Sequence, residues 1–323
     1  MRNTVMLGRH DVAVGVRSRP TLSSTSRQVG GRIEADLEAI LRDATKDVRP
    51  TDSMLRFYNT VGRLPFRLGS VLMLLTSLDA IRVIWNAGIQ RRTDSALQPI
   101  YNYHFRWWRG PWAFGDMLWQ LSYNTRSVRA RGLFVRSAVR YLLERSVREK
   151  ATTNGHEPAL VVSLGSGSAS QFLTALAENG FKSGVQAILV DRDPRALSAG
   201  NENAQKLRVN WAVETRQSSV GFFLKGATEL SLVEMVGLAD YFGDQSLSHH
   251  CQMIYDALGQ DGIFLGANIS SRDEYEYAHG AACWPRMFYR TEEEIRTILE
   301  QSGFQSIWTG VCGLYTVWVA WKR

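Results

Sequence analysis

The sequence predicts an α/β protein in which an all-helical region precedes a mostly parallel sheet. The first observation is the pattern of residues 159–193, which reads as a strand, a glycine turn, a helix and a second strand ending in Asp191. The second is an alternation of strand-like and helical segments after residue 158, whereas no period-2 alternation precedes it. A chain of 323 residues is long enough for this arrangement and for a substantial core.

The residues before the sheet divide into a basic tail and a helical region. Residues 1–32 contain six Arg and one acidic residue, Asp11, which predicts a disordered tail; a transit peptide is the weaker alternative. Residues 33–150 are predicted to be helical and residues 151–323 to form the sheet domain. The apolar run that begins at Gly69 is about half of the roughly 20 residues that a membrane span needs, so it predicts a buried helix.

The remaining strands of the parallel part are short apolar runs between turn signals. A GQDG sequence at 259–262 predicts the turn that ends one helix and leads into the fifth strand. The predicted segments are a first strand at 160–164, a third at 209–213 or 215–220, a fourth at 232–238, a helix at 246–258 and a fifth strand at 262–267.

The carboxyl-terminal segment predicts a capped helix followed by an antiparallel hairpin. Thr291 and Glu294 have the spacing of a capping box, and Gly303 follows the helix that they would begin. The runs 305–311 and 314–321 are separated by a short Cys-Gly turn, which predicts a terminal hairpin. A plain dinucleotide-binding fold has no such hairpin.

The glycine turn indicates which class of nucleotide binds. Gly165 and Gly167 permit a tight turn with close backbone approach, and Asp191 lies 22 positions after Ala169, near the spacing at which a carboxylate meets ribose hydroxyls. Ser170 stands where the dinucleotide fingerprint has its third glycine, so pyrophosphate binding is not favoured. The pattern suits a cofactor with a ribose and no phosphate, of which S-adenosylmethionine (SAM) is the commonest; a flexible loop is the alternative.

The net charge of +7 is concentrated in one segment. Residues 91–150 contain twelve Arg and Lys against four acidic residues, and so carry +8. A basic patch attracts polyanions, but the apolar residues at helical spacing within 128–147 favour a solvated helix face. Cys251, Cys283 and Cys312 form no disulfide or metal pattern, which favours a reducing, cytoplasmic location and no metal site.

The order of four motifs resembles that of the class I SAM-dependent methyltransferases. The motifs are LGSGSAS, ILVDRDP, MVGLADYF and GQDGIFLGANI, and the resemblance covers residues 123–323. It implies a seven-stranded Rossmann-like sheet with the last strand antiparallel, and SAM as the cofactor. GLADYF, GQDGIFLGANIS, WPRMFYRTEEEI and NTRSVRARGLFVRSAVRYLLE are more narrowly similar to a bacterial subgroup that includes methyltransferases linked to hydroxy fatty acid methyl esters. The sequence departs from the family pattern in that no acidic residue precedes Gly165, which leaves the contacts to the methionine part open.

The resemblance also implies a set of cofactor-binding residues. The glycine turn would line the amino-acid end of SAM, Asp191 would accept both ribose hydroxyls, and Arg192 would lie against the adenine. Residues at the end of the third strand would contact the adenine. Residues that follow the fourth strand would lie between the cofactor and the acceptor. The implied residues are Gly165, Ser166, Gly167, Asp191, Arg192, Ser219, Val220, Gly237 and Leu238.

Candidate catalytic residues follow the fourth strand, because ligands lie at the carboxyl ends of parallel strands. Asp240 and Tyr241 come directly after it, and His249 lies in the next helix beside His250. A general base is needed only if the acceptor must lose a proton. Neither a [DN]-P-P-[YF] sequence nor a Pro-Cys pair follows the strand, so a small or lipid-like acceptor is expected, with O-methylation favoured.

Two aromatic segments are candidates for the acceptor pocket. One is the insert at 270–290, and the other is 101–123 within the helical region, which would act as a lid whose arginines reach a carboxylate. Stacking of nucleobases and a plain structural core are the alternatives for 101–123. The candidate acceptor-binding residues are Arg106, Arg109, Tyr123, Tyr275, Trp284, Tyr289 and Arg290.

The sequence is compatible with two further functions. The basic aromatic segment 91–150 would suit an RNA or protein acceptor, although nucleic acid is not favoured. A fold that binds SAM without catalysing a reaction would make the chain a regulatory module.

Overall fold

Seven strands form one mixed sheet in the computed structural model of the chain, in the order β3-β2-β1-β4-β5-β7-β6. β1 to β5 run parallel, and β7 is antiparallel to both of its neighbours, β5 and β6. This confirms the predicted seven-stranded sheet with its last strand antiparallel. The strands are β1 (Ala159–Leu164), β2 (Val185–Asp191), β3 (Val213–Gln217), β4 (Leu230–Val236), β5 (Leu258–Ile269), β6 (Ser306–Cys312) and β7 (Tyr315–Trp321).

The structure describes residues 24–65, 68–89, 93–101, 103–153, 158–180 and 184–323. Among them, the strand order reverses at β1, which lies between β2 and β4. The connections to the next strands leave on opposite sides of the sheet at this point, so a crevice opens beyond the carboxyl ends of β1 and β4. The central strands are apolar and buried on both faces, as a parallel sheet covered by helices requires.

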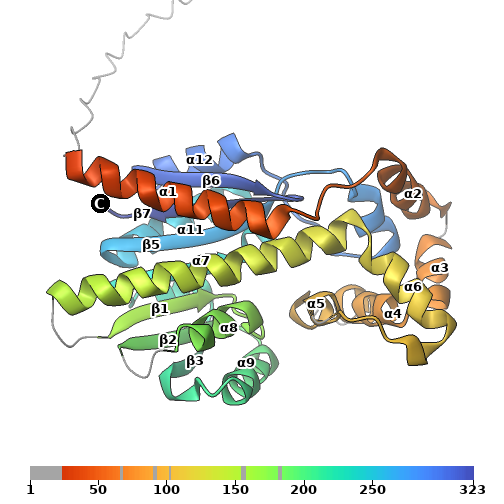
Figure 1. Cartoon of the computed structure of the whole chain (residues 1–323), viewed down its shortest axis with the longest axis horizontal. Coiled ribbons are helices and arrows are strands. Elements are labelled where there is room, and N and C mark those ends of the chain that lie inside the picture. The colour runs from red at the N-terminus through yellow and green to blue at the C-terminus, as the bar shows by residue number, and fades with distance from the viewer. Residues whose placement is uncertain (1–23, 66–67, 90–92, 102, 154–157, 181–183) are drawn as a thin grey trace, which may run out of the picture. The chain divides into compact units, whose positions relative to one another are not determined.

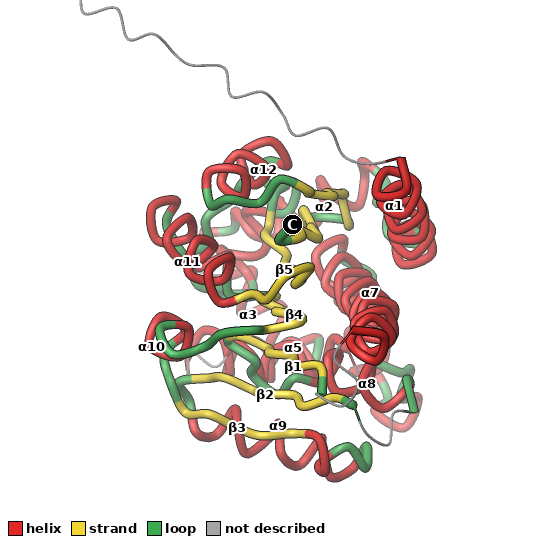
Figure 2. The backbone as a smooth tube through the Cα atoms, turned by 90° about the vertical axis from the view of Figure 1, so that its left-hand side faces the viewer, coloured by secondary structure: helices red, strands yellow, loops and turns green. Residues whose placement is uncertain are grey.

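Helices cover both faces of the sheet (Figure 2). α7 (Tyr123–Thr153) and α8 (Ser170–Glu178) lie on one face, where α9 (Pro194–Lys206) packs against α8, β2 and β3. α10 (Val220–Leu224), α11 (Asp244–Ala257) and α12 (Glu292–Gln301) lie on the other face. α7 is the longest of these helices and contacts β1, β4, β6 and β7. It therefore spans the sheet and reaches both its centre and its antiparallel edge.

The predicted helical region is present before the sheet. It comprises α1 (Ser24–Thr45), α2 (Asp52–Arg63), α3 (Leu68–Thr76), α4 (Leu78–Val83), the π-helical turn η2 (Ile84–Ile89), α5 (Thr93–Tyr101), the 3-10 turn η3 (Trp107–Arg109) and α6 (Pro111–Gln120). The described residues divide into two units between Asp36 and Leu37, and the second unit extends to Arg323. In the second unit, α2 to α6 gather beyond one end of the sheet (right side of Figure 1). No helix in the described part of the chain combines the length and the apolar character of a membrane span.

The tail predicted for residues 1–32 overlaps α1. Residues 1–23 lie outside the described residues, and residues 24–32 belong to the helix that begins at Ser24. In the second unit, α7 links the helical region to the sheet. It contacts α5 and α6 on one side and β1, β4, β6 and β7 on the other.

Several strand boundaries differ from the prediction for local reasons. β3 begins at Val213 because residues 210–212 form a 3-10 turn after α9, and it ends before Ser219, whose hydroxyl caps α10. The GQDG segment is part of β5 and not a free turn, although the pairing with β4 is irregular there. The capping box of Thr291 and Glu294 and the terminal hairpin are both confirmed.

Gly266 of β5 makes room for a buried indole. It stands opposite Trp318 of β7, and a Cβ at position 266 would lie 2.1 Å from a Trp318 ring carbon. Gly266→Ala is expected to lower the free energy of unfolding by about 1–3 kcal/mol, because a fully buried ring must shift. Urea denaturation measures this change. Gly226→Ala, where an added Cβ meets nothing within 4 Å, serves as the control; equal midpoints for the two variants would argue against the packing described.

Candidate functional site

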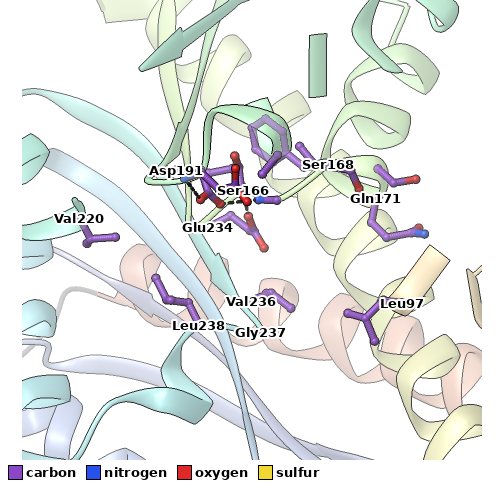
Figure 3. Close-up of a pocket in the computed structure, with 18 of the residues that line it drawn as sticks. Leu97, Ser166, Ser168, Gln171, Asp191, Val220, Glu234, Val236, Gly237 and Leu238 are labelled. Carbon is purple, nitrogen blue, oxygen red and sulfur yellow. Dashed lines mark hydrogen bonds between the residues drawn. The ribbon is translucent and has the colours of Figure 1, made fainter. Parts of the chain in front are cut away.

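A cavity of about 550 Å³ lies at the carboxyl ends of β1, β2 and β4. Its volume falls in the range of small-molecule sites. Figure 3 shows Asp191, Ser166 and Glu234 close together, with Val220 and Leu238 on one side and Leu97 of α5 across the cavity. All nine residues that the sequence suggested for the cofactor border it: Gly165, Ser166, Gly167, Asp191, Arg192, Ser219, Val220, Gly237 and Leu238.

The glycine turn is held tightly against its neighbours. Gly165 has a φ of +63°, and a Cβ there would lie 2.7 Å from a methyl group of Leu238, so the position needs glycine both for its conformation and for space. The N–H of Ser166 donates to the carbonyl of Val190 at 3.0 Å. The Ser166 hydroxyl is buried and has no hydrogen-bond partner among the described residues.

Asp191 ends β2 and holds the turn in place. One carboxylate oxygen accepts the N–H of Gly167 at 2.9 Å, and the other accepts the N–H of Asp193 at 3.0 Å. A carboxylate has about four acceptor positions, so about two remain for hydroxyl groups of a ligand. Asp193 has a different task, since its side chain caps α9 through the N–H of Arg195. The roles of Asp191 and Asp193 can thus be distinguished by substituting each one separately.

A buried carboxylate in the cavity wall was not anticipated from the sequence. Glu234 of β4 is 6% exposed, and its neighbour on β1, Ser163, donates its hydroxyl to it at 2.5 Å. Burial raises the pKa of Glu234 to about 7, although Ser163, the backbone of Val236 and Arg131 lower it. The available signal was an acidic residue inside an otherwise apolar strand, LSLVEMV. Such a residue needs a polar partner or a cationic ligand.

Arg131 forms a second unanticipated part of the wall. It lies on α7 with its guanidinium 4.2 Å from the ring centre of Tyr315 and 3.7 Å from the carboxylate of Asp240. It also donates to the hydroxyl of Tyr101 at 3.4 Å. Arg131 is almost fully buried and lies beside Gly237 at the end of β4. Arg131 therefore contributes a positive charge to the cavity wall near the end of β4.

The three candidate catalytic residues occupy different environments. Tyr241 borders the cavity, and its hydroxyl accepts the indole N–H of Trp284 at 3.2 Å. Asp240 lies behind the wall, where its carboxylate accepts the N–H of Ile269 at 2.6 Å and faces Arg131. Burial raises the pKa of Asp240, while Arg131 opposes the shift. His249 is exposed and does not border the cavity, whereas its neighbour His250 does.

None of the seven candidate acceptor-binding residues borders the cavity directly. Arg106 and Arg109 pair with Asp79, at 3.6 and 3.0 Å, and Arg109 also pairs with Asp116, so these arginines neutralise buried acids of the helical region. Tyr123 begins α7, where its N–H donates to the buried carboxylate of Glu274 at 2.9 Å.

The remaining four candidates belong to the insert after β5. Tyr275 and Tyr289 contact each other and His279, and the Tyr289 hydroxyl lies 3.0 Å from the His279 ring. Trp284 reaches the cavity only through Tyr241. Arg290 is buried and donates to Asn268, Asp244 and the carbonyl of Phe242, which itself borders the cavity. The insert thus supports the cavity wall from behind.

Within the described ranges, no group of three His, Cys, Asp or Glu side chains is arranged to hold a metal ion. The charged groups that border the cavity are Asp191, Asp193 and Glu234 together with Arg131 and Arg192. These groups suit a ligand that carries both positive and negative charges.

Comparisons with known proteins define the fold. Neither a protein-family model nor a curated protein sequence matches this chain. A solved structure of a possible exported protein from Bordetella parapertussis matches with 16% identity over 94% of this chain and 100% of that chain, at a TM-score of 0.56. The CurJ carbon methyltransferase matches with 11% identity over 93% of each chain, at a TM-score of 0.50. The chain therefore has a Rossmann-like fold that is similar, over nearly its whole length, to that of a methyltransferase.

Proposed function

We propose that this chain is a SAM-dependent methyltransferase that acts on a small-molecule or lipid-like acceptor, with an oxygen as the favoured acceptor atom. The observation that carries the proposal is the cavity at the switch point of the sheet. There, a glycine turn that lacks the third glycine of the dinucleotide fingerprint lies beside Asp191 and a buried carboxylate, Glu234. The similarity of the fold to a carbon methyltransferase supports the reaction class. The resemblance to the hydroxy fatty acid methyl ester subgroup supports a lipid-like acceptor.

The residues that border the cavity fit the parts of SAM. Asp191 would accept the ribose hydroxyls, and Arg192, Ser219 and Val220 would surround the adenine. The α-carboxylate would lie at the amino-terminal end of α8, where backbone N–H groups favour negative charge. Glu234 would face the α-ammonium group, because a buried carboxylate with one hydroxyl donor is stabilised by a cation.

When bound, SAM supplies a methyl group on a positively charged sulfur. The chain's own residues would align the acceptor with this methyl group and exclude water, which together account for much of the catalysis in such a displacement. Gly237, Leu238 and Tyr241 would border the acceptor, together with Tyr101 and Arg131, which line the same cavity. The Tyr241 hydroxyl would hold the acceptor oxygen, and Asp240 would act as a positioning residue through Arg131.

We propose the helical region as the lid over the acceptor. Its support is α5, which contributes Leu97 and Tyr101 to the cavity. Several arginines of 91–150 are engaged within the protein: Arg126 donates to backbone carbonyls, Arg129 to Gln120, and Arg136 to Glu178. These contacts favour a small acceptor over RNA.

Incubation with methyl-labelled SAM and an extract of the host cell tests the function. The expected result is formation of S-adenosylhomocysteine together with label in a small or lipid-soluble product. Label in the RNA or protein fraction would favour the macromolecular acceptor instead. Binding of SAM without any S-adenosylhomocysteine would favour the regulatory module.

Tyr241→Phe separates binding from catalysis. The variant is expected to reduce the turnover of the labelled product by about 10- to 100-fold, since it removes one positioned hydroxyl at the reacting end of the cavity. The dissociation constant of SAM should stay within about twofold, because this hydroxyl contacts the acceptor and not the cofactor. Tyr255→Phe, outside the cavity, is the matched control. A parallel loss in both variants would remove Tyr241 from this role.

A further inference from the structure

Residues 57–121 expose an unusual concentration of apolar side chains. Fourteen of the twenty large apolar side chains that are exposed in the described part of the chain belong to this segment, and the other six are spread over 133–311. Single exposed apolar residues are ordinary, whereas a concentration of them marks a contact surface. α3 packs against α2 and α6, and α6 packs against η3; we refer to the exposed apolar side chains of these four elements as the apolar face.

The apolar face includes a complete helical stripe. On α3, Leu68, Val71, Leu72 and Leu75 stand at positions i, i+3, i+4 and i+7 and are 48, 45, 45 and 68% exposed. A helix normally turns such a stripe toward the core. The run that predicted a buried helix therefore has one apolar side in solvent, while Gly69, Ser70 and Met73 on its other side are buried.

Neighbouring elements extend the apolar face. α3 packs against α2 and α6, and the Tyr58 hydroxyl of α2 donates to the Leu118 carbonyl of α6 at 2.5 Å. Figure 1 shows these three helices together at the end of the molecule opposite β1 and β2. Phe114 and Leu118 are exposed one turn apart on α6, and Trp107 and Trp108, just before α6, are 75 and 61% exposed.

The sequence segment that bears the apolar face has a positive net charge. Residues 57–121 contain seven Arg against three Asp and no Glu or Lys, a net charge of +4. Asp79 and Asp116 are buried and are neutralised by Arg106 and Arg109, which are themselves mostly buried, so neither these acids nor these arginines give the surface a net charge. Arg63 and Arg82 keep 69 and 58% of their side chains exposed, although each has an acidic neighbour at 3.9 Å. An anionic surface is the complement of this arrangement.

We propose that the apolar face docks onto a bilayer that contains anionic lipids. Exposed leucines would enter the boundary between headgroups and acyl chains, tryptophans would lie at the headgroup level, and the arginines would contact lipid phosphates. A second copy of the chain complements the face less well, because a two-fold interface places the same positive margins opposite each other. The proposal does not depend on the methyltransferase function.

Flotation of the full chain with lipid vesicles tests the proposal. Vesicles of phosphatidylcholine mixed with phosphatidylglycerol are expected to bind the protein, and vesicles of phosphatidylcholine alone to bind it more weakly. The double variant Trp107→Ala, Trp108→Ala should lose at least about tenfold in partitioning, since two exposed interfacial rings are removed. The pair Leu72→Gln, Leu75→Gln should show a loss of the same order.

Trp211→Ala is the matched control, because Trp211 is 47% exposed outside the apolar face. It should change the partitioning by less than about twofold. Circular dichroism and urea midpoints check that each variant is folded, and the basic amino-terminal residues are the same in all of them. The proposal is overturned if the mixed vesicles do not bind the protein or if the Trp107/Trp108 variant binds like the parent. It is also overturned if sedimentation velocity shows a dimer that these substitutions abolish, since the face would then join two copies.

Discussion

Replacing Asp191 by alanine is expected to weaken SAM binding by at least about 100-fold. Its carboxylate already fixes the glycine turn through the N–H of Gly167, and its remaining acceptor positions would take the ribose hydroxyls of the proposed cofactor. Hydrogen bonds to a charged group contribute roughly 1.5–3 kcal/mol each, and two of them exceed the 2.7 kcal/mol that corresponds to 100-fold. Calorimetric titration of SAM into the parent chain and into Asp191→Ala measures the difference.

Asp193→Asn is the matched control for this prediction. Asp193 also borders the cavity, and asparagine removes its charge while it preserves a side chain able to cap α9. We expect its effect on SAM affinity to stay below about fivefold, because the charge is not placed to bind the ribose. An equal loss in both variants would show that only the overall negative charge of the cavity matters. Unchanged affinity in Asp191→Ala would remove the ribose-binding role.

Glu234→Gln is expected to weaken SAM binding by about 30- to 1,000-fold. The substitution keeps the shape of the side chain and an oxygen for the Ser163 hydroxyl but removes the charge that would face the α-ammonium group. Loss of one partner of a buried charge pair costs about 2–4 kcal/mol, which corresponds to this range. Glu214→Gln, on β3 and outside the cavity, is the matched control and should leave the affinity unchanged.

The same carboxylate gives SAM binding a pH dependence. Glu234 has a pKa of about 7 in the ligand-free protein, so it becomes protonated as the pH falls below 7 and then no longer attracts a cation. The affinity for SAM should rise between pH 5.5 and pH 7, by up to about tenfold per unit, and then level off. Glu234→Gln should flatten this profile. A profile that is identical in the variant would assign the pH dependence to another group.

The stability of the ligand-free protein should show the opposite trend with pH. Because the pKa of Glu234 is raised from its ordinary 4.5 to about 7 on folding, the folded state binds the proton more tightly than the unfolded state. The contribution to stability is fully present below about pH 4.5 and is lost as the pH rises through 7. Glu274 has the same direction of shift and adds to the trend. Urea denaturation of the parent chain and of Glu234→Gln at several pH values separates the contribution of Glu234 from that of Glu274.

The order of the elements could be predicted because each is marked locally. Glycine turns, capping residues and apolar runs each mark one helix or strand. The capping box at Thr291 and the terminal hairpin were predictable because both depend only on residues that are close in the sequence. The third strand, predicted at 209–213 or 215–220, is found at Val213–Gln217, so only its bounds differ; Ser219 and Val220 had been predicted to end it, whereas the serine caps a short helix there. Strand propensity alone does not show where a serine side chain will bond to the local backbone and begin a helix instead.

The walls of the cavity could be predicted only in part. Residues in the turn and directly after the strands followed from the fold class, since ligands lie at the carboxyl ends of parallel strands. Arg131 comes from the first third of α7, and its position beside the end of β4 depends on how that helix crosses the sheet. Arg106 and Arg109 suggested a carboxylate ligand, but their partners are Asp79 and Asp116, which pair with them only after the helices have packed.

Calorimetric titration of SAM into the unmodified full chain at pH 7.5, followed by competition, is the most direct measurement for the proposed cofactor. We expect one site per chain with a dissociation constant on the order of micromolar, competition by S-adenosylhomocysteine, and no competition by NAD. The missing third glycine at Ser170 and the carboxylate of Glu234 both favour this outcome. No detectable binding of SAM, or displacement of SAM by NAD, would contradict it.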